Sequence, residues 1–271
     1  MRQPPLLPCC HGSDSPRLRE SDAVNGAPVV DGVFLALWLL IFVSATLQSI
    51  SGFGYALLSA PILTAVLGGP LAVSTVLITG TACDLAILGM RRRLPRPVSG
   101  EVWRLAVWSV PGMAAGAVLL AQLPTRWLQV FVALVVIAAV AMRVRSDPSD
   151  EAVPSTWAAG AGFTSGALST STSLGGPPTV LYLSHRSLTP HVMRDTLVAL
   201  SLARVPLSVI ALAAVGVWEV YPAWPLLIVA ALAGQFVGTH LFHRFAASRY
   251  DKVVMALLLV SALSALGAVT Q

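Results

Sequence analysis

The chain has 271 residues, of which 56% are hydrophobic and only 11% charged; the mean hydropathy is +0.78 and the formal net charge +5. A soluble domain averages about 25% charged residues, so this composition excludes an ordinary soluble globular protein. The basic residues are scattered through short loops instead of forming a stripe with aromatic residues, so the net charge does not indicate a nucleic-acid partner. The long uncharged runs predict an all-α polytopic protein in a lipid bilayer.

The predicted elements begin after a polar tail at 1–28, which contains no apolar core of a signal peptide and is expected to be disordered. A hydrophobic element at 30–67 is interrupted at 51–54. Helices are predicted at 70–90, 102–121 and 126–143, followed by a hydrophilic linker at 145–155, an interrupted element at 156–184, and helices near 191–216, 221–243 and 250–269.

The pattern restarts after the linker, which predicts two membrane repeats at 29–144 and 156–271 with about eight hydrophobic segments in total. Three features recur in the same order: Ser51-Gly52 with Ser165-Gly166, Gly112-x-x-x-Gly116 with Gly234-x-x-x-Gly238, and TRWLQV (125–130) with SRYDKV (248–253). Glycines at this spacing also serve close helix packing without any repeat. Three matches in one order favour a duplication.

The positions of the basic loops predict how the repeats are oriented. If each interrupted element enters and leaves on the same face, the loops at 91–97, 143–145, 186–194 and 244–252 share one side, and the opposite loops retain only Arg126. Arg17 and Arg19 of the tail count against this arrangement, although acidic residues surround them. If each element crosses instead, the basic residues divide almost evenly, which conflicts with the positive-inside tendency. We therefore predict an inverted repeat, with the first segment of each repeat re-entrant, the basic loops in the cytoplasm and both termini outside.

The two breaks are the main functional signal. A helix break inside a membrane persists only where protein or a water-filled cavity covers it, and in inverted-repeat transporters the freed helix N-termini face an anion near the midplane. Tight packing of small residues is the alternative at each single position. The candidate substrate-binding residues are Ser49, Ser51, Gly52 and Gly54 in the first break, and Ser165, Gly166, Ser169, Thr170, Ser171, Thr172, Ser173, Gly175 and Gly176 in the second.

The stretch beginning SGFGYALLSAPILTAVLGG, with the basic loop and glycine-bearing helix that follow it, resembles the first half of the TauE/SafE family of membrane permeases. GFTSGALSTSTSLGGPPTVLYL is similar to the second glycine-rich break of that family. The resemblance covers about 30–270 and implies export of a small anion: sulfite, a sulfonate or a related organosulfur compound. The first break departs from the family pattern because it keeps only two glycines, which affects the choice of substrate more than the fold.

Two charged residues lie within predicted membrane helices, where such residues are costly and are functional candidates. Asp84 belongs to the helix at 70–90 and Arg204 to the helix at 191–216. We predict an Asp84–Arg204 pair, acting as a structural ion pair or as a gate that the anion opens, with Arg204 also a substrate contact. The alternative is that the Arg204 side chain extends to the membrane–water interface. Histidines make protons candidate coupling ions, although the histidines near loops and interfaces are more simply explained as bystanders.

Two other functional classes remain open. An intramembrane hydrolase would use Ser165 as nucleophile with His240 or His243 as base, and a non-transporting scaffold or assembly factor would need no polar breaks. No P-loop is present, so the sequence predicts no ATP-driven pump. We predict no catalytic residue, no metal site and no cofactor, a multi-pass location in the plasma membrane (the inner membrane of a bacterium), and a homodimer as a candidate assembly.

Overall fold

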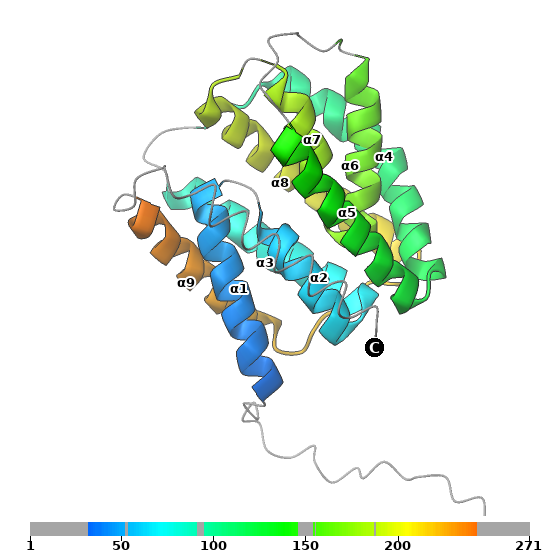
Figure 1. Cartoon of the computed structure of the whole chain (residues 1–271), viewed down its shortest axis with the longest axis vertical. Helices are drawn as coiled ribbons and strands as arrows, with labels where there is room; N and C mark the ends of the chain where they lie inside the picture. Colours follow the sequence, from blue (N-terminus) through cyan, green and yellow to red (C-terminus); the bar gives the residue numbers. More distant parts are fainter. Residues whose placement is uncertain are drawn as a thin grey trace, which may run out of the picture.

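A computed structural model describes residues 32–51, 54–90, 95–145, 154, 156–186 and 188–242, and every regular element within these ranges is an α-helix (Figure 1). The helices are α1 (Gly32–Ser51), α2 (Tyr55–Leu67), α3 (Gly69–Met90), α4 (Ser99–Gln122), α5 (Thr125–Arg145), α6 (Trp157–Thr172), α7 (Gly176–Ser184), α8 (Pro190–Ala214) and α9 (Trp224–Phe242). The all-helical prediction is confirmed. The tail at 1–28, most of the linker and the helix expected at 250–269 lie outside the described residues.

Four of the described helices are long and apolar enough to cross a membrane; these segments are Gly32–Ser49, Gly69–Met90, Ser99–Gln122 and His191–Ala214. Their outward faces carry aliphatic side chains that water would disfavour, such as Leu35, which is 50% exposed. The side chains of Trp103, Trp127 and Trp157 are more than half exposed near helix starts. Tryptophan is enriched at membrane–water interfaces, so these exposed rings fit a multi-pass membrane protein.

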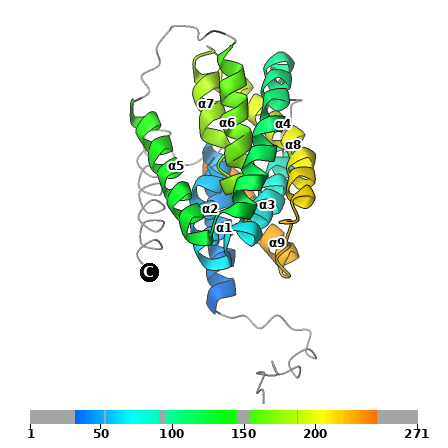
Figure 2. The ribbon, with the colours of Figure 1, turned by 90° about the vertical axis from the view of Figure 1, so that its right-hand side faces the viewer.

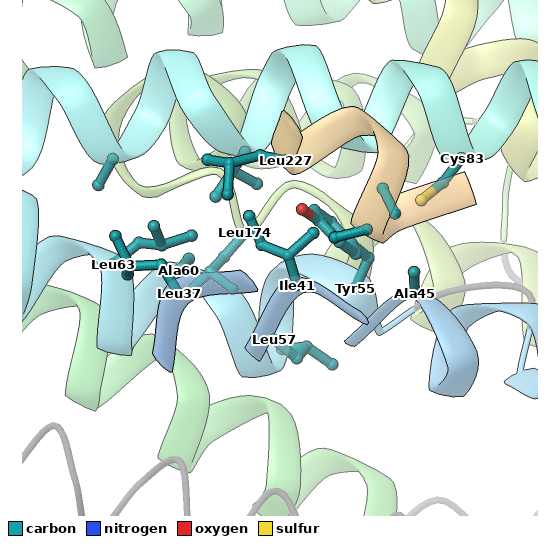
Figure 3. Packing of buried hydrophobic residues seen from close by; sticks show 14 residues of the cluster. Leu37, Ile41, Ala45, Tyr55, Leu57, Ala60, Leu63, Cys83, Leu174 and Leu227 are labelled. Atoms are coloured by element: carbon teal, nitrogen blue, oxygen red, sulfur yellow. The ribbon is translucent and has the colours of Figure 1, made fainter. Parts of the chain in front are cut away.

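The first hydrophobic element turns back on itself at its break. Gly54 follows the break with φ 121°, a conformation that glycine adopts without steric cost, and α2 begins at the next residue. Figure 3 shows that α1 and α2 pack antiparallel, because Leu37 lies near Leu63 while Ala45 lies toward the Tyr55 end of α2. Within the described residues the element is therefore interrupted and consists of two antiparallel helices.

The second element has the same form. α6 ends where Ser173 adopts a left-handed conformation with φ 61°, and α7 returns beside α6. Ser165 of α6 and Thr179 of α7 share a hydrogen bond of 2.7 Å between their hydroxyls. In Figures 1 and 2, α1 begins at the lower end of the molecule and α6 at the upper end. The two broken elements thus enter from opposite ends.

The most extensive helix contacts join helices of different halves: α4 packs on α6, and α9 packs on α1. A Cβ atom on the facing glycines would collide with a backbone carbonyl of the partner helix, so only glycine permits this approach. The pairs are Gly112 with Phe163, Gly116 with Ala167, Gly234 with Phe42, and Gly238 with Thr46. Each half therefore supplies a fourth helix that covers the first helix of the other half.

Two groups of polar contacts connect the start of α4 with the start of α8 and with the end of α7. The backbone amide of Arg96 donates to Asp195 at 3.0 Å, which fixes the loop before α4 to the start of α8. Nearby in sequence, Glu101 of α4 accepts a hydrogen bond of 2.9 Å from the Tyr182 hydroxyl and forms a 3.0 Å ion pair with Arg186. These contacts hold the basic loops before α4 and α8, and the end of α7, around the start of α4.

Candidate functional site

A cavity of about 170 Å³ lies between the two breaks and is walled by α3 and α8. One water needs roughly 10–15 Å³ of such volume, so the cavity has room for a small solute. Seven of the predicted site residues line it, namely Gly54, Asp84, Ser169, Ser173, Gly175, Gly176 and Arg204. Gln48, Tyr55 and Thr179 also line it and were not singled out from the sequence.

Both breaks present the start of a short helix to this cavity. α2 begins after Gly54 and α7 after Gly175, and neither N-terminus has a side-chain cap. The first amides of a helix have no partner within that helix, and the helix dipole makes this end partially positive. Pro177 suits the first turn of α7 because its missing N–H would be unpaired there in any case. The starts of α2 and α7 therefore add partial positive charge to the cavity wall.

Arg204 is the strongest positive group on this wall. Its residue is only 7% exposed, and its Nη1 donates a 2.8 Å hydrogen bond to the Ser165 hydroxyl. Within the described part of the chain, Nε and Nη2 have no hydrogen-bond partner. A buried guanidinium with two free donors has unused capacity for an oxygen ligand.

Ser165 holds Arg204 in place instead of lining the cavity. Its hydroxyl donates to the carbonyl oxygen of Gly175, shares a 2.7 Å hydrogen bond with Thr179, and accepts from Arg204. Ser165 thus ties α6 to the second break and to α8. Among the described residues, no His, Asp or Glu hydrogen-bonds to Ser165. His240 lies on α9 and contacts the Phe236 carbonyl, and His243 lies outside the described residues.

The second break is shorter and later than predicted. Residues from Ser165 to Thr172 are helical, and the break spans only 173–175. The hydroxyls do not disrupt α6 because several of them bond to carbonyls one turn earlier, as Ser171 does to Ala167 at 2.7 Å.

Three of these residues bond within α6 or pack against α4. Thr170 donates to the Met113 carbonyl of α4 at 2.8 Å, Thr172 donates to the Leu168 carbonyl at 2.9 Å, and Gly166 lies against the Ser109 carbonyl. The alignment of Ser51-Gly52 with Ser165-Gly166 was therefore wrong. α1 ends at Ser51 and α6 at Thr172, which makes Gly54 and Gly175 the matching glycines.

The first break has a different arrangement of charge. The Ser49 side chain is buried away from the cavity, and its carbonyl accepts a 2.9 Å hydrogen bond from Arg194 of α8. A cation suits the C-terminal end of α1, where the helix dipole is negative. The Ser51 side chain and Gly52 lie outside the described residues.

Asp84 lies on the same cavity wall but does not form an ion pair with Arg204: no nitrogen–oxygen distance between them is 4.0 Å or less. The Asp84 residue is 5% exposed and accepts a 2.9 Å hydrogen bond from Gln48 Nε2. Ser201 of α8 lies beside the same carboxylate. Since Ser201 precedes Arg204 by one helical turn, the two charges are offset by about 5 Å along α8.

The described residues contain no group of three or more His, Cys, Asp or Glu side chains that could hold a metal ion. The sequence matches the family profile described as Sulfite exporter TauE/SafE over residues 37–265, a range that includes both breaks and every wall of the cavity. Neither a curated protein nor a solved structure matches the chain significantly. The extent of the family match, together with the apolar helices, shows that this multi-pass cell-membrane protein belongs to the TauE/SafE sulfite exporter family.

Proposed function

We propose that the protein is a permease that moves a small anion, most simply sulfite, a sulfonate or a related organosulfur compound, out of the cell through the cavity between the two breaks. The observation behind this proposal is the buried guanidinium of Arg204, whose Nε and Nη2 have no partner within the described residues. Leaving buried charged donors unpaired costs free energy. An anion against Arg204 removes this cost.

The chemistry of the wall suits an oxyanion. A guanidinium offers parallel N–H groups that match two oxygens of one anion, and the helix starts at Gly54 and Gly175 add partial positive charge. The Ser173 hydroxyl, also without a hydrogen-bond partner in the described part, is a further donor on the wall. Helix ends and hydroxyls bind an anion without adding a second full positive charge, which favours release as well as binding.

We further propose that the two halves form an inverted repeat of about eight segments, with the cavity where they meet. Three observations support this arrangement: the broken elements run in opposite directions, α4 and α9 make equivalent glycine contacts, and matched positions face the same cavity. The matched positions, counted from the helix ends, are Gln48 with Ser169 and Gly54 with Gly175. Such symmetry gives a route to alternating access, because one half rocks against the other around a fixed site.

The experiment is anion flux into proteoliposomes, comparing sulfite, sulfate and a small sulfonate. Arg204→Gln should reduce saturable flux about 10- to 100-fold, since a hydrogen bond to a charged group contributes about 1.5–3 kcal/mol. Arg204→Lys should recover only part of it, because an ammonium lacks the planar fork. Arg104→Gln is the matched control, since the Arg104 side chain is 54% exposed on α4 and outside the cavity. Folded protein without saturable flux for any of the anions would refute the proposal.

Three further predictions stay open. A membrane scaffold would keep its phenotype when the polarity of the breaks is removed, whereas a permease would lose it. Labelling of Ser165 by a serine-reactive probe would favour the hydrolase. The homodimer would appear as twice the protomer mass in a detergent-corrected mass measurement.

A further inference from the structure

The cavity holds two opposite charges that do not touch. Among the described residues that line it, the ionisable side chains are Tyr55, Asp84 and Arg204. With the cavity empty, the positive charge of Arg204 is balanced by the negative charge of Asp84 across the same small space. An anion that binds Arg204 disturbs this balance.

The surroundings of Asp84 offer no second cation. From α1 the carboxylate meets the Gln48 amide, and from α8 it meets Ser201. α9, which also packs on α3, contributes the uncharged Gln235 near this level, where its amide reaches the carbonyl of Cys83.

The remaining ionisable groups around Asp84 are few. α2 contributes Tyr55, whose hydroxyl donates to Thr79 at 2.5 Å, and α3 itself contributes the buried thiol of Cys83. On α8, Arg194 donates to the Ser49 carbonyl beyond the cavity wall. No described Arg, Lys or His nitrogen lies within 4.0 Å of the Asp84 carboxylate. Arg204 is thus the cation of the cavity wall that balances Asp84.

An anion at Arg204 would place a second negative charge in the same cavity as the ionised Asp84, and the residues Asp84 and Arg204 are only 5% and 7% exposed. A neighbouring like charge and a low dielectric both favour the neutral form of a carboxyl group. We propose that the anion crosses together with one proton held by Asp84, so that each transport cycle is electrically neutral. This inference rests on the proposed permease function and adds the coupling ion to it.

The proton balance follows directly. On one side of the membrane, an anion binds Arg204 and a proton binds the Asp84 carboxylate; on the other side both leave, and the site regains its opposite charges. One negative and one positive charge move together, so the net charge moved is zero. Because linkage is reciprocal, protonation of Asp84 strengthens anion binding as much as the anion strengthens protonation. Affinity therefore rises as the pH falls, by at most about tenfold per pH unit.

The test uses the full chain in proteoliposomes with methanesulfonate, an anion that does not itself titrate between about pH 5 and 8. A potassium gradient with valinomycin sets the membrane potential, and a trapped pH indicator counts protons. We expect one proton taken up per anion, no change of flux with membrane potential, and inward flux driven by an acidic exterior. Asp84→Asn should move the anion without protons and should respond to the potential, whereas Asp84→Glu should keep the coupling. Glu219→Gln, which removes an exposed carboxylate, is the control and should behave as wild type.

The outcomes separate the inference from the function on which it rests. Wild-type flux that follows the potential and takes up no proton would overturn the inference and leave the permease intact; this measurement needs no variant. Transport of aminomethanesulfonate but not methanesulfonate would also overturn it, because the ammonium of the solute would then neutralise Asp84. Absence of flux for every anion, sulfite included, in folded protein would refute the permease itself.

Discussion

In the second break, we expect the structure to tolerate Gly176→Ala but not Gly175→Ala. A Cβ at Gly175 would lie 2.7 Å from the carbonyl oxygen of Ser165 and 2.9 Å from the Cβ of Ser169, both on α6. A Cβ at Gly176 would meet no atom within 4 Å. Gly175 has φ −68° and ψ −10°, which alanine adopts easily, so any cost of Gly175→Ala is steric rather than conformational.

The magnitude follows from overpacking. An extra methyl group in a well-packed interior costs about 1–3 kcal/mol. α6 cannot move away from the added methyl group, because its glycines lie against the backbone of α4. The residues of the break must therefore shift toward the cavity. For a chain of this size, each kcal/mol lowers the melting temperature by about 2–4 °C, so the melting temperature of Gly175→Ala should fall by about 2–12 °C.

The assay is thermal unfolding of purified protein in detergent, run on Gly175→Ala, Gly176→Ala and wild type together. Gly176→Ala should keep the wild-type melting temperature, because its methyl group enters open space. Flux through Gly175→Ala should fall even below its melting temperature, since the displaced tip narrows the cavity. Equal melting temperatures for the two variants would refute the steric argument.

Three further changes test the contacts that hold the helices together, each followed by thermal unfolding. Glu101→Gln should cost about 1–3 kcal/mol because it leaves the partly buried Arg186 with a weakened acceptor, whereas Arg104→Ala should change little since its ion pair is longer, at 3.7 Å, and its side chain half exposed. Tyr55→Phe should cost about 1 kcal/mol through loss of one hydrogen bond to α3; no change would show that this bond is not formed. Gly238→Ala should reduce folded yield, because its Cβ would lie 2.7 Å from the Ser49 Cβ and against the backbone of α1; normal yield would contradict the close packing of α9 on α1.

Much of the fold was predictable because its causes are local. A glycine-rich interruption within an apolar run has few solutions in a membrane, and the break before Gly54 was predicted within a few residues. The second break was placed too early because Ser165 and the hydroxyl residues after it look like helix breakers. In an apolar surrounding the same hydroxyls bond to their own helix, so polarity alone did not reveal where α6 ends.

The site was predictable in its parts but not in its connections. Asp84 and Arg204 are conspicuous as charges at membrane depth, and both line the cavity. Their lack of direct contact depends on the angle between α3 and α8, which no local pattern specifies. Gln48 was missed as the partner of Asp84, although an amide in an apolar run was an available signal. The role of Ser165 in orienting Arg204 required the position of α8 against α6.

The crossed packing of α4 on α6 and of α9 on α1 has a consequence for biogenesis. As the chain leaves the ribosome, α1 is synthesised before the other described helices. The helix whose glycines pack against α1, α9, is synthesised last among them. α4 likewise waits for α6 across the hydrophilic linker. A nascent chain stopped before residue 224 would lack the contacts of α9 on α1, although α1 would still pack on α2. The packing around α1 is therefore completed only after α9 has been synthesised.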